Sequence, residues 1–96
     1  MSVRFEWDAR KATLNLGKHE VSFDEATTVF DDPLARIFDD LDHSLEEHRE
    51  IIVGQSVSGR LILVCFIERT KDVIRIVSAR SLTRTERKDY EEANNS

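Results

Sequence analysis

The chain has 96 residues, of which 40% are hydrophobic and 34% are charged, a composition typical of one small folded domain and not of a disordered segment. The formal net charge of −5 argues against a generic nucleic-acid-binding protein. The longest apolar run falls well short of the ~20 residues that a membrane-spanning helix needs. The single cysteine, Cys65, cannot form an intrachain disulfide, and no signal peptide is recognisable. We therefore predict a single domain over residues 1–96 that works in the cytoplasm without membrane contact.

Charge is unevenly distributed along the chain. Residues 20–50 contain eleven acids against two bases, which gives −9, whereas residues 60–90 contain eight bases against four acids, which gives +4. This asymmetry is consistent with a basic partner for the first segment and an anionic ligand for the second. The alternative is that both segments form solvated faces.

Apolar periodicity and capping signals divide the chain into strands and helices. Asp8 is placed to cap a first helix, and Ser22 with Glu25, like Thr83 with Glu86, has the spacing of a capping box. Pro33 ends the second helix. The expected elements, in order, are strand 3–7, helix 9–18, helix 22–31, strand 34–38, strand 49–55, strand 60–69, strand 73–80 and helix 84–93.

The order of these elements predicts an α+β fold. Four consecutive strands with short turns favour an antiparallel meander, on which two N-terminal helices and one C-terminal helix pack. Strand 60–69 should be central, since its apolar run is long enough to be buried on both faces. In strand 73–80, simple alternation places Arg75 and Arg80 on opposite faces.

The strongest candidate site lies at the ends of these two central strands and on their neighbour. It comprises Glu68, Arg69, Arg75 and Arg80, with Arg49 from strand 49–55. Metal-free RNA cleavage needs a base for the 2′-OH, an acid for the leaving oxygen and cations for the charged phosphorane, and a guanidinium matches phosphate as a planar fork. The alternative is that Glu68 only pairs with Lys71 or Arg75 at the hairpin end.

Other catalytic and metal-binding signals are weak. The three glycines form no phosphate-binding loop, and one cysteine cannot make a cysteine-based metal site. His43 and His48 lie among acids that could form a carboxylate–imidazole metal site with them, but their spacing fits no defined metal motif, and a solvated loop is the favoured interpretation. His19, Ser44 and Asp42 have no signal that would bring them together as a triad. Cys65 is expected to be buried and poorly ionised, which argues against a role as a nucleophile.

An ordered set of short motifs resembles the BrnT family of toxins from about Val3 to Glu91. The matching segments are Phe5-Glu6-Trp7-Asp8, Lys11, Asn15, Lys18-His19-Glu20-Val21-Ser22-Phe23, Glu25-Ala26, Val29-Phe30-Asp31-Asp32-Pro33, Asp42-His43-Ser44, Glu47-His48-Arg49, Gly59-Arg60-Leu61, Glu68-Arg69, Arg75-Ile76-Val77-Ser78-Ala79-Arg80 and Glu86-Arg87-Lys88-Asp89-Tyr90. The resemblance implies a RelE-like fold and an endoribonuclease toxin of a type II toxin–antitoxin system that arrests translation and growth. It also implies a BrnA-like antitoxin with a ribbon-helix-helix dimer, through which the toxin would reach DNA only indirectly.

The resemblance also implies roles for individual residues. Glu68, Arg75, Arg80 and His43 are the expected catalytic residues, and Arg49, Arg69, His19 and Lys18 the expected RNA-binding residues, with no metal or other cofactor. The family usually has glycine where this chain has Glu20, so a left-handed turn there should cost about 1 kcal/mol. Two alternatives remain, namely a degenerate module that only binds the antitoxin, and a scaffold without activity. The sequence leaves open ribosome dependence, RNA preference and oligomeric state.

Overall fold

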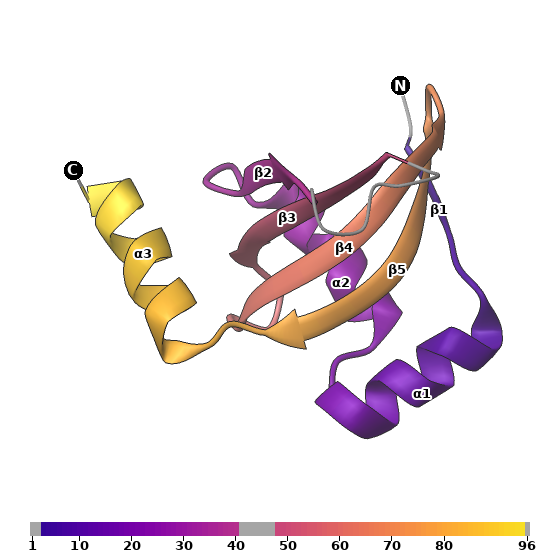
Figure 1. Ribbon diagram of the computed structural model, residues 1–96, viewed down its shortest axis with the longest axis horizontal. Helices are drawn as coiled ribbons and strands as arrows, with labels where there is room; N and C mark the ends of the chain where they lie inside the picture. Colours follow the sequence, from indigo (N-terminus) through magenta and orange to yellow (C-terminus); the bar gives the residue numbers. More distant parts are fainter. Residues whose placement is uncertain (1–2, 41–47, 96) are drawn as a thin grey trace.

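The computed structural model describes residues 3–40 and 48–95 (Figure 1). Its elements lie within about two residues of the predicted ones, and the second predicted helix is a short α-helix followed by a 3₁₀ turn. They are β1 (Arg4–Glu6), α1 (Ala9–His19), α2 (Phe23–Thr28), η1 (Val29–Asp31), β2 (Arg36–Asp39), β3 (Arg49–Gln55), β4 (Leu61–Thr70), β5 (Val73–Ser81) and α3 (Arg84–Asn95).

The strands form one sheet in the order β1-β5-β4-β3-β2. Strands β2 to β5 are the predicted antiparallel meander, and the α+β class is confirmed. The expectation of a purely antiparallel meander was wrong, because β1 runs parallel to β5, with Arg4 beside Val73 and Glu6 beside Arg75. Parallel neighbours need a long crossover, and the rest of the chain between β1 and β5 supplies it.

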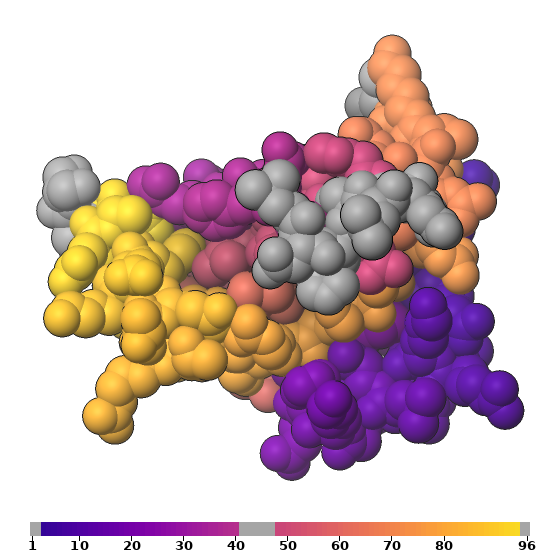
Figure 2. All heavy atoms as spheres, in the orientation of Figure 1, coloured from indigo at the N-terminus to yellow at the C-terminus, as the bar shows by residue number. Residues whose placement is uncertain are grey.

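The hydrophobic core lies between the N-terminal helices and one face of the sheet, which we call the inner face. Aromatic side chains contribute to this core. Trp7 packs edge-on against Phe23, and Phe30 packs edge-on against Phe66. The residues of the core cluster are Val21, Phe23, Ala26, Val29, Ile52, Ile62, Val64, Phe66, Ile76 and Ala79. Helix α3 lies instead beside the opposite face, which we call the outer face, and Figure 2 shows α3 and α1 on opposite sides of the molecule.

The local helix signals are largely confirmed. Asp8 Oδ1 accepts from the backbone N–H groups of Arg10 and Lys11, at 2.9 and 3.1 Å. Glu20 ends α1 in the left-handed conformation with φ of 58°, so it adopts the geometry for which glycine is suited. Ser22 caps α2 through the N–H of Glu25 at 3.0 Å.

The carboxylate of Glu25 has a tertiary contact that a capping box does not predict. It accepts hydrogen bonds from Arg60, Ser56 and Ser58, and Arg60 also donates to the carbonyl oxygen of Glu20 at 3.0 Å. These bonds, those from Arg60 above all, lower the pKa of Glu25 to about 2 against the opposing effect of burial. The cluster ties α2 to the turn between β3 and β4.

Asn15 closes part of the sheet edge beyond the end of β1. Its amide nitrogen donates to the carbonyl oxygens of Ala79 (2.8 Å) and Val21 (3.0 Å), and its Oδ1 accepts from the N–H of Ala79 at 3.1 Å. The side chain is buried, and it takes the place of a neighbouring strand on β5. Asn15 thereby holds α1 against the sheet.

A β-bulge in β5 decides which arginines share a face. Cys65 lies opposite Ser78, but the next residue of β4, Phe66, lies opposite Ile76, so Val77 is an extra residue in β5. The alternation therefore shifts by one residue within β5. Because Arg75 lies opposite Ile67 and Arg80 opposite Leu63, both arginines lie on the outer face. The prediction that they point to opposite faces was wrong.

Candidate functional site on the outer face

Cross-strand pairing gathers charged side chains on the outer face. Arg49 of β3 lies opposite Ile67, as Arg75 of β5 does from the other side, and Arg80 lies opposite Leu63. A cavity of about 360 Å³ opens among these strands. Its lining residues are Asp40, Arg49, Ile51, Leu63, Cys65, Ser78, Arg80 and Glu86. The site therefore combines two guanidinium groups and two carboxylates above an apolar floor.

Arg80 has the most defined geometry in this cavity. Its Nη1 and Nη2 donate to Glu86 Oε1 and Oε2 at 2.8 and 2.9 Å, and Nη1 also donates to the carbonyl oxygen of Ser81 at 3.2 Å. The Glu86 contact raises the pKa of Arg80, and the Arg80 contact lowers the pKa of Glu86 to about 2. The pair is thus a bidentate ion pair at neutral pH, in which the guanidinium faces an oxyanion as it would face a phosphate.

Asp40 is a site residue that the sequence analysis missed. It is only 7% exposed, and it accepts a hydrogen bond from the Cys65 thiol at 3.3 Å. Burial and the Asp40 contact raise the pKa of Cys65 to about 11, so Cys65 is a protonated, buried thiol, as expected. The signal that could have identified Asp40 is the pairing of β2 with β3. This pairing places Asp40 beside Arg49, to whose carbonyl oxygen the N–H of Asp40 donates at 2.9 Å.

Arg75 lies on the same face but outside the cavity. Its Nη1 forms an ion pair with Oε2 of Glu6 at 2.8 Å, across the parallel β1–β5 pairing. Arg75 and Arg49 flank Ile67, so they lie two strand spacings apart, roughly 10 Å. The outer face therefore has two arginines, on β3 and β5, on either side of Ile67 of β4, and one of them, Arg49, lines the cavity with Arg80.

The remaining predicted residues lie elsewhere. Glu68 lies opposite Ile74, which packs against the core, so by register it is on the other face from Arg80. Glu68 and Arg69 are exposed near the tip of the β4–β5 hairpin, where Arg69 is itself an extra residue. Lys18 and His19 end α1, and the cavity lining does not include them. His43 lies outside the described residues.

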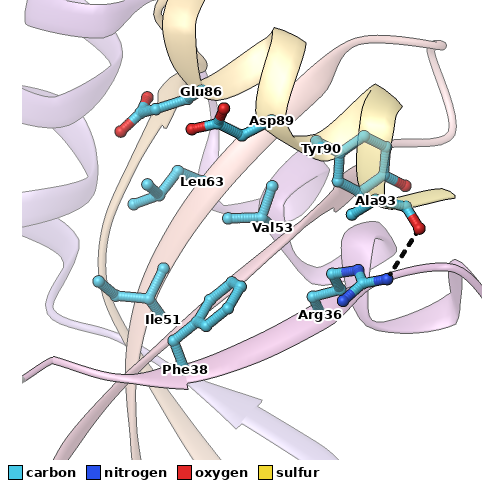
Figure 3. A pocket seen from close by; sticks show the side chains of 9 residues that line it. All are labelled: Arg36, Phe38, Ile51, Val53, Leu63, Glu86, Asp89, Tyr90 and Ala93. Carbon is cyan, nitrogen blue, oxygen red and sulfur yellow. Dashed lines mark hydrogen bonds between the residues drawn. The ribbon is translucent and has the colours of Figure 1, made fainter. Parts of the chain in front are cut away.

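A second cavity, of about 410 Å³, separates α3 from the sheet (Figure 3). Apolar side chains of β2, β3 and β4 point toward the helix from below, and Tyr90 and Ala93 face them from α3. Arg36 donates to the carbonyl oxygen of Ala93 at 3.2 Å at its rim. The lining residues are Arg36, Phe38, Ile51, Val53, Leu63, Glu86, Asp89, Tyr90 and Ala93.

Part of the acidic and histidine-rich segment forms a surface cluster. Ligand atoms of Asp39, His48 and Glu50 lie within 4.8 Å of one another, and His48 Nε2 is 3.0 Å from Asp39 Oδ1. His48 and Asp39 are exposed. His48 contacts Asp39, and the pairing of β2 with β3 places Glu50 opposite Asp39.

The fold and this face define a small α+β protein whose arginines suit an anionic polymer or phosphate ligand. A family model described as "Ribonuclease toxin, BrnT, of type II toxin-antitoxin system" matches residues 7–86. The chain therefore belongs to the BrnT family of ribonuclease toxins of type II toxin–antitoxin systems.

A solved structure supports the fold. The 1.1 Å crystal structure of the Brucella abortus ribonuclease toxin BrnT aligns with a TM-score of 0.67 and 20% sequence identity, over 86% of this chain and 100% of that chain. At this identity the likeness shows a shared fold. A search of the curated proteins found no significant match. Among the described residues, no helix is long and apolar enough to cross a membrane.

Proposed function

We propose that this toxin is an endoribonuclease that cleaves RNA without a metal ion, with Arg80 and Arg49 as its phosphate-binding groups. The supporting observation is the cavity on the outer face that both arginines line. Two guanidinium groups in a partly enclosed cavity can stabilise the extra negative charge of a phosphorane, and such preorganised charge is a large contribution to catalysis.

The proposed reaction is attack by the ribose 2′-oxygen on the adjacent phosphorus. A base takes the 2′-OH proton, the bond from phosphorus to the 5′-oxygen breaks, and an acid protonates that oxygen. The products are a 2′,3′-cyclic phosphate and a 5′-hydroxyl end. His43 is the proposed proton-transfer residue. Glu68 is the other candidate, but by register it lies on the face opposite Arg80, which argues against proton transfer to a phosphate bound there.

RNA binding would extend along the outer face. Arg75 lies in the same cross-strand row as Arg49, and it would bind a neighbouring phosphate by exchanging Glu6 for the ligand. Arg69, Lys18 and His19 are the proposed peripheral contacts. Cleavage of cellular RNA would arrest translation and growth. The toxin would therefore act in the cytoplasm.

The proposed protein partner is a BrnA-like ribbon-helix-helix antitoxin, through which the toxin would act on its own promoter. Family membership implies an antitoxin, and the acidic segment 20–50 suits basic partner residues. Helix α3 should take part in this contact, because it lies over an incompletely filled apolar cavity. Unchanged antitoxin affinity after deletion of residues 84–96 would contradict this role for α3.

Incubation of purified protein with total RNA in excess EDTA tests the activity. We expect cleavage by the wild type, a loss of about 100-fold or more in Arg80→Ala, and a smaller loss in Arg49→Ala. Arg10→Ala is the matched control, because Arg10 is an exposed cation on α1, away from the cavity. Glu68→Ala tests proton transfer separately.

Two results would contradict the proposal. Full activity of Arg80→Ala would exclude the cavity as the site. Inactivity of the folded wild type on RNA, both free and on ribosomes, would favour a module that only binds the antitoxin.

A further inference from the structure

Glu86 occupies the Nη1–Nη2 edge of Arg80, an edge through which a guanidinium group can bind a phosphate. Its two carboxylate oxygens accept from Nη1 and Nη2 at 2.8 and 2.9 Å, which is the fork geometry that guanidinium groups use for carboxylates and phosphates alike. One fork cannot bind both partners in this way. The Arg80 site therefore has an internal anion in place.

The same carboxylate belongs to the first turn of α3. Glu86 Oε1 accepts from the N–H of Thr83 at 2.9 Å, and Thr83 Oγ1 accepts from the N–H of Glu86 at 3.2 Å, so the predicted capping box is formed. The side chain that completes the capping box of α3 is thus the side chain that pairs with Arg80. The position of α3 and the accessibility of Arg80 are coupled through one side chain.

The attachment of α3 is suited to release. Besides Glu86, Tyr90 Oη donates to Asp32 Oδ2 at 3.1 Å and Arg36 donates to the carbonyl oxygen of Ala93, and water can replace both hydrogen bonds. Beneath the helix lies the 410 Å³ cavity instead of close apolar packing (Figure 3). The Arg80 and Glu86 side chains are 36% and 34% exposed, so solvent and salt screen their pairing.

We propose that α3 is an autoinhibitory strap, in which Glu86 imitates an RNA phosphate and holds the Arg80 site closed. An RNA phosphate must displace Glu86 to reach the fork, and a partner that moves α3 changes how easily this happens. This inference rests on the proposed function, since it takes Arg80 as the phosphate-binding group.

Glu86→Gln tests the strap without removing the helix signal, because glutamine also serves in a capping box. The probe is a labelled 2′-O-methyl RNA oligonucleotide, which cannot be cleaved, and its dissociation constant is measured by fluorescence anisotropy. We expect Glu86→Gln to bind the probe about 3- to 10-fold more tightly than the wild type. The gain should disappear in the double variant Glu86→Gln with Arg80→Ala.

Asp89→Asn is the matched control. Asp89 lies one turn further along α3 and lines the second cavity, and its substitution also removes one negative charge. It has no ion pair with Arg80, so its affinity should stay within about 2-fold of the wild type. An equal gain in both variants would mean that net charge, and not the fork, controls binding, and would overturn the proposal.

Cleavage assays on the same variants separate this inference from the proposed function. Tighter probe binding by Glu86→Gln with no cleavage by any variant would support the strap and contradict the ribonuclease assignment of this site. Cleavage by the wild type, with unchanged or weaker probe binding by Glu86→Gln, would support the ribonuclease assignment and contradict the strap. Glu86 would then be a residue that positions Arg80. If no variant cleaves RNA and Glu86→Gln shows no gain in probe affinity, both proposals are contradicted.

Discussion

The two faces of the sheet differ in how they are covered. On the inner face, Val21, Phe23, Ile62 and Val64 are at most 2% exposed, and they pack against one another between helices and strands. On the outer face, α3 leaves a cavity and Phe38 is 51% exposed. The inner face thus accounts for most of the stability. The outer face is free to combine charges that a tightly packed core would exclude.

The largest expected effect compares two phenylalanines on these faces. Phe23→Ala removes a side chain that is 2% exposed, and we expect it to lower the free energy of unfolding by about 3–5 kcal/mol. Phe38→Ala should cost less than about 1 kcal/mol, because Phe38 already contacts solvent. Urea denaturation followed by circular dichroism measures both. Equal losses would mean that the outer face contributes as much packing as the inner face.

The next effect compares two carboxylates whose pKa is about 2, Glu25 and Glu86. A pKa below the ordinary 4.5 contributes stability above about pH 4.5, and this contribution is lost as the pH falls toward 2. Glu25 is 16% exposed in its side chain, whereas Glu86 is 34% exposed and its pairing is more strongly screened. Arg60, the partner of Glu25, is 40% exposed in its side chain, so solvent also reduces the contribution of the Glu25–Arg60 pair to stability.

We therefore expect Glu25→Gln to remove about 1–2 kcal/mol of the stability that the wild type loses between about pH 6 and pH 3. Glu86→Gln should remove less than about 1 kcal/mol of it. Unfolding free energies of both variants and the wild type at the two pH values provide the measurement. If Glu86→Gln removed more of the pH-dependent stability than Glu25→Gln, the Glu86–Arg80 pair would be the stronger one, contrary to our expectation.

The smallest effect concerns the attachment of α3. Tyr90→Phe removes the hydrogen bond to Asp32, which still accepts from the N–H groups of Gln55 and Leu34 at 2.7 and 2.9 Å. We expect a loss of about 0.5–1 kcal/mol that is confined to α3. Amide hydrogen exchange should be faster in residues 84–95 and unchanged in β4. A uniform change over the sheet would show that α3 unfolds only together with the core.

Neighbours along the chain determined much of this protein. The caps at Asp8, Ser22 and Thr83, the antiparallel order of β2 to β5, and the buried state of Cys65 follow from short-range hydrogen bonding and apolar periodicity. These features depend on residues within a few positions of one another. The set of motifs also predicted the family that the comparison found.

Only the tertiary structure decided which charges meet. The extra residue Val77 brings Arg75 and Arg80 to one face, and a register shift of one residue cannot be read from alternation alone. The parallel pairing of β1 gives Arg75 its partner Glu6, and the path of α3 gives Arg80 its partner Glu86. Such contacts join residues whose proximity depends on the register and packing of whole elements, so periodicity and spacing along the chain do not specify them.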